Sequence, residues 1–157
     1  RTGKRILLNE SYVALPYHLR YIVVQIVPHK ESAGKSFSDL GLARTILKHV
    51  QKHFGTVGAG AVEQGFRVKY CNDETKITIL RCRHRAHRFV TSILPLMSVI
   101  SDQRAKFRIL YIGATIMQCN KFIVAYQNNY LMRKCGKIIS KKARMDFIEN
   151  VMDFEID

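Results

Sequence analysis

Residues 65–88 read GFRVKYCNDETKITILRCRHRAHR. Two alternating apolar runs flank the polar residues 72–75, which is the pattern of two antiparallel strands joined by a turn. The second run leads into residues 81–88, which contain four arginines and two histidines and where a helix is expected to begin. These cations therefore collect at one edge of a predicted sheet, and the free N–H groups of the helix start favour the same anionic ligands.

The segment before this hairpin predicts a strand, a helix and a connection. Residues 18–27 form an apolar run rich in β-branched residues, which we expect to be a strand buried largely on both sides. Ser38 is a good N-cap for an amphipathic helix that Gly55 closes. We expect residues 58–60 to connect this helix to the first hairpin strand, residues 62–71. The solvent-exposed face of the predicted helix carries Arg44, Lys48 and Lys52.

The segment after the hairpin predicts one more strand and further helices. Apolar residues recur at helical spacing from about residue 84 to residue 100, and Pro95 should kink that helix. Residues 106–116 alternate as a strand, and a helix with an apolar stripe follows from about residue 118 until Gly136 breaks it. A short last helix is indicated by Phe147, Ile148, Val151 and Phe154.

The order β-α-β-β-α-β followed by helices decides the predicted fold. It indicates an α/β chain, an α+β sandwich with a ferredoxin-like or RRM-like antiparallel sheet and additional C-terminal helices. A chain of 157 residues fits one such domain. We expect a basic N-terminal extension over residues 1–16, the ferredoxin-like domain over residues 17–135, and a C-terminal helix with an acidic end over residues 136–157.

The charge is large and unevenly distributed. Lys and Arg number 26 against 12 Asp and Glu, and five of the acidic residues follow Arg144, so residues 1–144 carry +19. Such a charge indicates a polyanionic partner. The membrane alternative is weaker, because the longest apolar run is far shorter than the roughly 20 residues of a spanning helix. The four cysteines show no CxxC pair, which suits a reducing, intracellular compartment, and the charge indicates the nucleus.

Motifs of catalysis and metal binding are incomplete. Residues 33–36 end like a phosphate-binding loop but lack its first glycine. Cys82, His84 and His87 have no fourth zinc ligand at suitable spacing, and arginines surround them. The acidic pair at residues 73–74 sits where a hairpin turn needs polar residues. We therefore predict no catalytic residue, no metal ligand and no cofactor bound by the protein itself.

The basic residues have two interpretations, a solvated sheet face or a binding surface for RNA backbone. Arg67 and Lys69 alternate along their strand with Phe66, Val68 and Tyr70, so the two sets are expected on opposite faces. The third strand has no aromatic residue for base stacking, which favours backbone binding over the RNA recognition motif's base reading. We expect one side of the sandwich to gather the side chains of Arg20, Arg67, Lys69, Arg81, Arg83, Arg85 and Arg88.

Four motifs in order resemble a known family. They are HLRYIVV at residues 18–24, GFRVKY at 65–70 with ILRCR at 79–83, ILPL at 93–96, and GATIMQCNKF at 113–122. Over residues 18–131 the chain resembles the Pop-five (Pop-five/Rpp-fourteen) family, protein subunits of eukaryotic ribonuclease P and ribonuclease MRP. Lys121, inside the last motif, joins the predicted RNA-binding residues.

The resemblance implies a non-catalytic RNA-binding subunit that stabilises the catalytic domain of the ribonuclease P/MRP RNA. The complex would mature the 5′ end of precursor tRNA, its substrate, and process ribosomal RNA, with the chemistry carried by the RNA and its Mg²⁺. Rpp-thirty-like and Pop-one-like subunits are the implied protein partners, and the nucleus and nucleolus the implied location. The alternatives are a free-standing ferredoxin-like RNA-binding protein or ribosome assembly factor, and a metal-independent enzyme.

Overall fold

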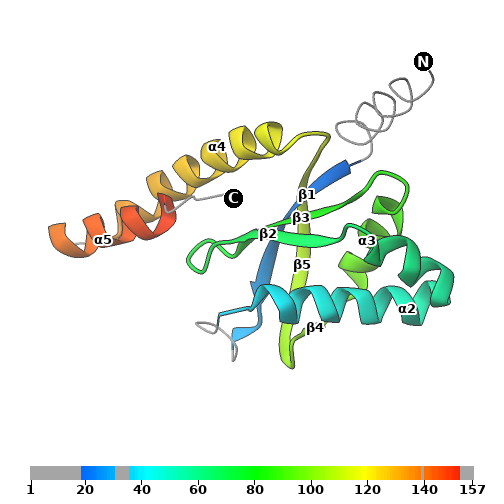
Figure 1. Ribbon diagram of the computed structural model, residues 1–157. Helices are drawn as coiled ribbons and strands as arrows, with labels where there is room; N and C mark the ends of the chain where they lie inside the picture. Colours follow the sequence, from blue (N-terminus) through cyan, green and yellow to red (C-terminus); the bar gives the residue numbers. More distant parts are fainter. Residues whose placement is uncertain (1–18, 31–35, 139, 153–157) are drawn as a thin grey trace, which may run out of the picture.

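The computed structural model describes residues 19–30, 36–138 and 140–152, and shows a sheet between helices (Figure 1). The predicted extension at residues 1–16, most of the loop at 33–36, and Phe154 lie outside the described residues. The elements are β1 (Leu19–Pro28), α2 (Asp39–Glu63), β2 (Arg67–Cys71), β3 (Ile77–Arg83), α3 (His87–Ile93), the 3₁₀ helix η2 (Leu94–Leu96), β4 (Val99–Ile100), β5 (Gln103–Gly113), α4 (Ile116–Cys135) and α5 (Lys141–Met152).

The sheet has the strand order β2-β3-β1-β5-β4, and every neighbouring pair is antiparallel. The central strand β1 lies between β3 and β5, and β2 pairs with β3 at one edge. This is the ferredoxin-like arrangement that the sequence predicts, with β4 added as a short hairpin partner of β5. Within the described residues, no helix is both long and apolar enough to cross a membrane.

Helices cover both faces of the sheet (Figure 1). On one face, Val24 and Leu80 pack with Ile46 of α2 in the main core, which α3 completes. On the other face, Val23 packs with Ile123 of α4 in a smaller core. Alternate side chains of β1 therefore pack into two different cores, which confirms that this strand is buried on both sides.

Helix α4 follows its predicted course closely. The Thr115 hydroxyl accepts a hydrogen bond from the Gln118 N–H at 3.3 Å and caps the helix start, and Gly136 follows its last residue. Cys119 and Ile123 of the predicted apolar stripe are fully buried against the sheet. The register of the helix is therefore set by local sequence periodicity.

The connection predicted at residues 58–60 is wrong. Gly55 has φ 68°, outside the helical region, but the chain re-enters a helix that continues to Glu63, and β2 starts only at Arg67. The second helical segment is retained because Gly58 packs against the Phe54 side chain and Val62 is fully buried. Gly55 therefore kinks α2 instead of ending it.

The single long helix predicted across Pro95 is also wrong. Helix α3 ends at Ile93, η2 contains Pro95, and Ile100 belongs to strand β4. Ile100 is fully buried. The apolar residues that predicted one long helix are therefore buried residues of a turn and a strand. Pro95 has no N–H to continue the α-helical hydrogen bonds, and the chain takes a 3₁₀ turn instead.

Strand β2 contains a bulge at Lys69. Val68 pairs with Leu80, but Tyr70 pairs with Ile79, so Lys69 is the extra residue of the bulged strand. The extra residue moves Tyr70 to the α4 face, while Val68 packs against the main core. The predicted placement of Tyr70 on the same face as Val68 is therefore wrong, because strand alternation does not hold through a bulge.

Candidate nucleic-acid interface

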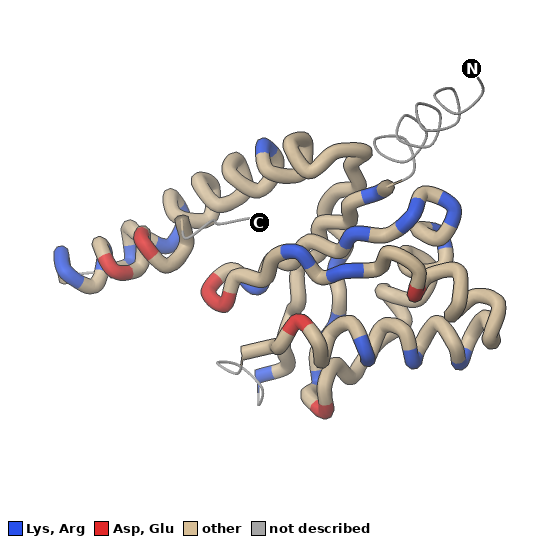
Figure 2. Tube along the Cα trace, in the orientation of Figure 1, with Lys and Arg blue, Asp and Glu red and all other residues tan. Residues whose placement is uncertain are grey.

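Strand pairing aligns arginines at one end of the sheet. Arg67 of β2 is directly opposite Arg81 of β3, and Arg81 is directly opposite Tyr21 of β1. Arg83 lies two residues further along β3, opposite Leu19, and so shares the face of Arg81. Lys and Arg positions continue from β2 and β3 into the loop that follows β3 (Figure 2). We call this set the basic band; its residues are Arg67, Arg81, Arg83, Arg85 and Arg88.

The charges of the basic band have no acidic partner among the described residues. Arg83 donates a hydrogen bond to the Gln64 amide oxygen at 2.9 Å, which fixes its direction and leaves its charge uncompensated. Arg81 is half-buried, and its Nε is shielded from solvent without a hydrogen-bond partner in the described part of the chain. The other members are exposed. The band is therefore a concentrated, uncompensated positive surface.

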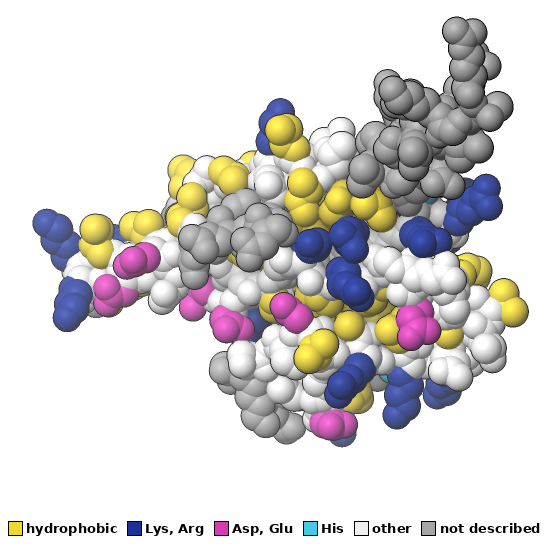
Figure 3. Space-filling model, in the orientation of Figure 1, with side chains coloured by type: hydrophobic (Ala, Val, Ile, Leu, Met, Phe, Trp, Pro, Cys, Tyr) yellow, Lys and Arg dark blue, Asp and Glu magenta, His cyan; other side chains and the backbone are white. Residues whose placement is uncertain are grey.

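Helix α4 covers only part of the sheet face on which Arg81 and Arg83 lie. The Cys119 thiol contacts the Tyr21 carbonyl, and α4 then runs over Val23 and on toward Gln25, whose side chain the Tyr126 hydroxyl meets at 3.2 Å. Arg81 and Arg83 lie at and beyond the row of Tyr21, outside this coverage. In the space-filling view, Lys and Arg side chains form a band between the α4 and α2 layers (Figure 3).

Base stacking on the middle of the sheet is prevented by the same helix. An RNA recognition motif stacks bases on aromatic side chains of its central strands. Here the corresponding positions of β1 and β3 carry Val23, Ile77 and Ile79, which are fully buried under α4. The exposed cations at the rim, in contrast, are accessible to backbone phosphates, and their binding of RNA stays a prediction.

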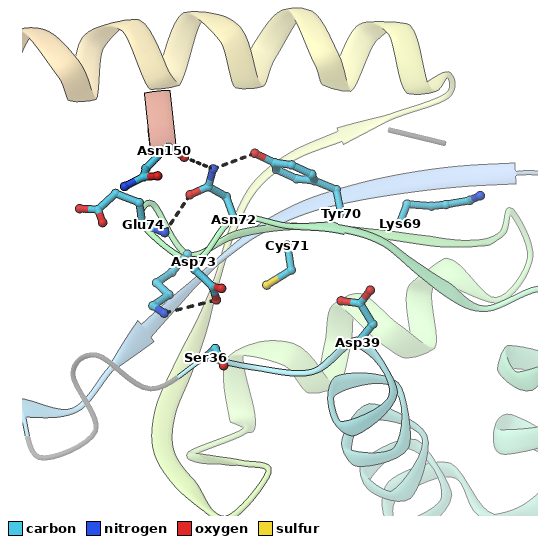
Figure 4. Close-up of a pocket in the computed structure, with 10 residues that line it drawn as sticks. Ser36, Asp39, Lys69, Tyr70, Cys71, Asn72, Asp73, Glu74 and Asn150 are labelled. Atoms are coloured by element: carbon cyan, nitrogen blue, oxygen red, sulfur yellow. Dashed lines mark hydrogen bonds and ion pairs between the residues drawn. The ribbon is translucent and has the colours of Figure 1, made fainter. Parts of the chain in front are cut away.

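Three of the predicted RNA-binding residues lie apart from the band. Arg20 pairs with Cys82 and so faces the main core's side of the sheet, which makes its predicted grouping with Arg81 wrong. Lys69 is the bulge residue, and its side chain points along β2 away from Asp73 and Glu74 (Figure 4). The third, Lys121, is exposed on α4, on the side away from the sheet. An RNA-binding role for each of the three stays a prediction.

The Cys82 side chain is separated from the two histidines considered with it. It is fully buried in the main core, and burial raises the pKa of its thiol to about 12. The ring of His84, in the loop after β3, stacks on the ring of His87 at the start of α3, with centroids 5.4 Å apart. Across the described residues, no group of three or more metal-binding side chains is present.

A polar cavity of about 930 Å³ opens between the β2–β3 turn, the start of α2 and the end of α5 (Figure 4). One of its lining residues is Asn72, which is buried although the sequence indicates only a turn residue. The Asn72 amide donates to the Tyr70 hydroxyl at 3.1 Å and to the carbonyls of Asn150 and Val151 at 3.2 and 3.4 Å. Its oxygen accepts the Glu74 and Thr75 N–H groups at 2.9 Å. Asn72 thus ties the hairpin to α5.

The sequence contains no signal for this role of Asn72. The amide at a turn is typical of a local Asx motif, which the two N–H bonds form. The contacts with α5 join residues about eighty positions apart in the chain, and so arise only in the folded protein. Its position makes Asn72 a structural residue at the edge of the cavity.

Most of the chain matches a known protein family. Residues 20–124, more than half of the chain, match the model of the Rpp14/Pop5 family. The chain belongs to the Rpp14/Pop5 family. This confirms the resemblance found in the sequence motifs, and the matched residues include the whole basic band.

Several relatives in the Rpp14/Pop5 family align over most of their length. The chain is 31% identical over 117 residues to the human ribonuclease P/MRP protein subunit POP5, with 72% of each chain covered. It is 30% identical over 117 residues to the bovine subunit of the same name, covering 72% of this chain and 69% of that one. The probable POP5 subunit of Arabidopsis thaliana is 25% identical over 129 residues, with 78% and 85% covered.

A solved structure shares the fold of this Rpp14/Pop5 chain. A chain in the cryo-EM structure of yeast ribonuclease MRP superposes with a TM-score of 0.51 at 10% identity, and the match covers 72% of this chain and 94% of that one. At this identity the similarity is one of fold. It agrees with the ferredoxin-like topology seen here.

Proposed function

We propose that this chain is a non-catalytic RNA-binding subunit of ribonuclease P and ribonuclease MRP. The observation that carries the proposal is the row of Arg67, Arg81 and Arg83 on an uncovered end of the sheet, without acidic partners among the described residues. Charges in this state favour a polyanion that replaces their counterions. The POP5 relatives, named as subunits of ribonuclease P/MRP, indicate which RNA to test first.

The role of the basic band is to hold backbone phosphates of the catalytic domain of the RNA. Guanidinium groups form paired hydrogen bonds with phosphate, which suits a surface made almost entirely of arginine. The folded RNA and its Mg²⁺ carry out the cleavage that matures the 5′ end of precursor tRNA, and in ribonuclease MRP the processing of ribosomal RNA. The proposed location is therefore the nucleus and nucleolus.

Protein partners are part of the same proposal. We expect Rpp-thirty-like and Pop-one-like subunits to bind this chain in the assembled particle. The exposed apolar side chains of α4 and α5, Met117, Val124, Met132, Met145 and Ile148, leave ample surface for such contacts.

Sequencing of RNA crosslinked to the native protein tests the proposed assembly. Enrichment of one or two stable RNAs, those of ribonuclease P and ribonuclease MRP, is the expected result. Broad enrichment of ribosomal RNA would instead support a ribosome assembly factor, and absence of bound RNA would reject both.

A pair of double variants tests the basic band itself. In Arg81→Gln/Arg83→Gln we expect affinity for transcribed ribonuclease P RNA to fall by about 1–3 kcal/mol, the range for charge-assisted hydrogen bonds. The matched control is Lys141→Gln/Lys142→Gln, which removes the same charge from exposed positions on α5. Wild-type affinity in the first variant, with the fold intact, would place the RNA elsewhere.

A further inference from the structure

A second group of cations lies along α2, apart from the basic band. Exposed Arg44, Lys48 and Lys52 are spaced four residues apart on α2, so they form one row along the helix. The residues at that helix's buried positions, Leu42, Ile46 and Val50, face the main core. The row therefore points away from the sheet, and Lys and Arg positions follow the outer flank of α2 in Figures 2 and 3.

The β4–β5 hairpin extends this row around the edge of the sheet. Arg104 and Lys106 are exposed on β5, alternating with Ala105, which is buried in the main core. A hollow of about 340 Å³ between α2 and the hairpin is lined by Arg44, Lys48 and Lys52 and by Val99. A second hollow, of about 540 Å³, is lined by Val99, Arg104 and Lys106. Val99 borders both hollows, so the two sets of cations adjoin each other around the edge of the sheet at this residue.

We call this the hairpin surface; its cations are Arg44, Lys48, Lys52, Arg104 and Lys106. Among the described residues none of the five has an ion-pair partner within 4 Å. Asp102 is the acidic residue that lines the hollow, so positive charge exceeds negative charge by a wide margin. His49 responds to this field: its pKa is lowered by partial burial first, and then by His53, Lys52 and Lys48.

The turn of the β4–β5 hairpin makes the surface well defined. Ser101 and Asp102 have φ values of 47° and 63°, which two-residue hairpin turns of type I′ require at both central positions. The Ser101 hydroxyl is shielded between the hairpin and α2, where Gly41 approaches it closely. The cations of α2 and β5 are thus held by a tight turn that packs on the helix.

The hairpin surface and the basic band lie at opposite edges of the sheet. The band is on β2 and β3, whereas the hairpin surface is on β5, β4 and the outer side of α2. Four strand spacings separate β2 from β4, which is about 19 Å. Along β1, the band is level with Tyr21 and Arg104–Lys106 are level with Pro28, about 23 Å further on.

We propose that the hairpin surface is a second phosphate-backbone binding site, so that this one domain bridges two separate segments of RNA. The inference rests on the proposed function for the identity of the ligand, because an uncompensated cationic surface of this size fits a polyanion. Residues spaced four apart rise about 6 Å along a helix, so the three cations of α2 extend over about 12 Å and can contact several phosphates of one RNA.

Bridging is measured with the full chain and two short RNA duplexes, one carrying a donor dye and the other an acceptor dye. Wild-type protein at half the RNA concentration should produce energy transfer and a complex of one protein with two duplexes by native mass spectrometry. Lys48→Gln/Lys52→Gln should abolish the energy transfer, leave one duplex bound, and weaken the second binding step about tenfold or more. Lys141→Gln/Lys142→Gln is the matched control and should bridge like the wild type.

The outcomes separate this inference from the proposed function. A single bound duplex in the wild type, lost in Arg81→Gln/Arg83→Gln, would overturn the second site and leave the first intact. Full bridging by Lys48→Gln/Lys52→Gln, with unchanged melting temperature, would also overturn it. A polyglutamate peptide that competes at the hairpin surface as strongly as RNA, at equal charge, would reject RNA in favour of an acidic protein segment. Failure of any duplex to bind would overturn both.

Discussion

Arg67 and Arg81 lie directly opposite each other on adjacent antiparallel strands, and the Nε of Arg81 is shielded without a hydrogen-bond partner in the described part of the chain. Like charges at directly opposed positions destabilise a strand pair. The folded state therefore retains an electrostatic cost at this position that a bound polyanion would relieve. Under the proposed function, the pair would couple the stability of the sheet to RNA binding.

Removing one member of this pair should stabilise the free protein and weaken RNA binding. We expect Arg67→Gln to raise the free energy of unfolding by about 0.2–1 kcal/mol in low salt, with the gain lost at high salt because the repulsion is screened. Urea unfolding at two salt concentrations measures this. Lys142→Gln on α5 is the control, and a lower stability of Arg67→Gln at low salt would contradict the prediction.

Binding through the basic band should depend strongly on salt. If its five arginines neutralise five phosphates, log K falls against log[salt] with a slope near −4.5 for a duplex, roughly 500-fold between 50 and 200 mM. A titration with a short duplex on the Lys48→Gln/Lys52→Gln background isolates the band. A slope close to zero would show that the band is not the binding surface.

Loss of the Asn72 side chain should loosen α5. Asn72→Ala removes bonds to the Tyr70 hydroxyl, to two α5 carbonyls and to two turn N–H groups, which we expect to cost about 2–4 kcal/mol. Urea unfolding measures the loss, and hydrogen exchange should be accelerated first in α5. Asn128→Ala, at an exposed position of α4, should change stability little. An effect of Asn72→Ala as small as that control would mean that α5 is held by packing alone.

Stability should fall in alkali because of Cys82. Burial raises the pKa of this thiol from 9.0 to about 12, so between these values the unfolded chain loses its proton while the folded chain keeps it. The contribution is therefore complete below pH 9 and is lost as pH rises, at up to about 1.4 kcal/mol per pH unit. The stability difference between wild type and Cys82→Ala should shrink from pH 8 to pH 10.5. A constant difference would contradict the assigned pKa.

The isolated protein should not cleave precursor tRNA at any Mg²⁺ concentration, because the proposed function assigns the chemistry to RNA. The measurement is a cleavage assay with nuclease-treated protein. Site-specific cleavage that a point mutation in the protein abolishes would show the chain to be an enzyme.

Local signals in the sequence predicted most elements of the fold. The β2–β3 hairpin, the N-cap at Ser38 and the stripe of α4 depend on residues within a few positions of each other. The same local pattern put Arg81 and Arg83 on one face of β3, and the structure confirms this. Patterns of period 2 and 3.6 are visible in the sequence because each is repeated within a single element.

The failures occur where distant contacts override a local pattern. Gly55 indicates the end of a helix and Pro95 only a kink. In the structure Gly55 bends α2, whereas α3 ends before Pro95 and the chain takes a 3₁₀ turn; Val62 and Ile100, beyond these points, are buried. The bulge at Lys69 reverses the face of Tyr70, whose hydroxyl accepts a hydrogen bond from buried Gln127 on α4 at 3.2 Å. Gln127 is 57 positions from Tyr70 in the sequence, so no local pattern contains this contact.

The sequence by itself determined the ferredoxin-like order of elements, the excess of positive charge and the family, since each is a property of composition or of neighbouring residues. Only the tertiary structure decided which cations lie near one another. Strand register places Arg20 on the face opposite Arg81 and places Arg67 directly across from Arg81. Lys48 of α2 and Arg104 of β5 line neighbouring hollows that share Val99. Strand register and helix packing fix these relations, because they bring together side chains that the chain itself keeps far apart.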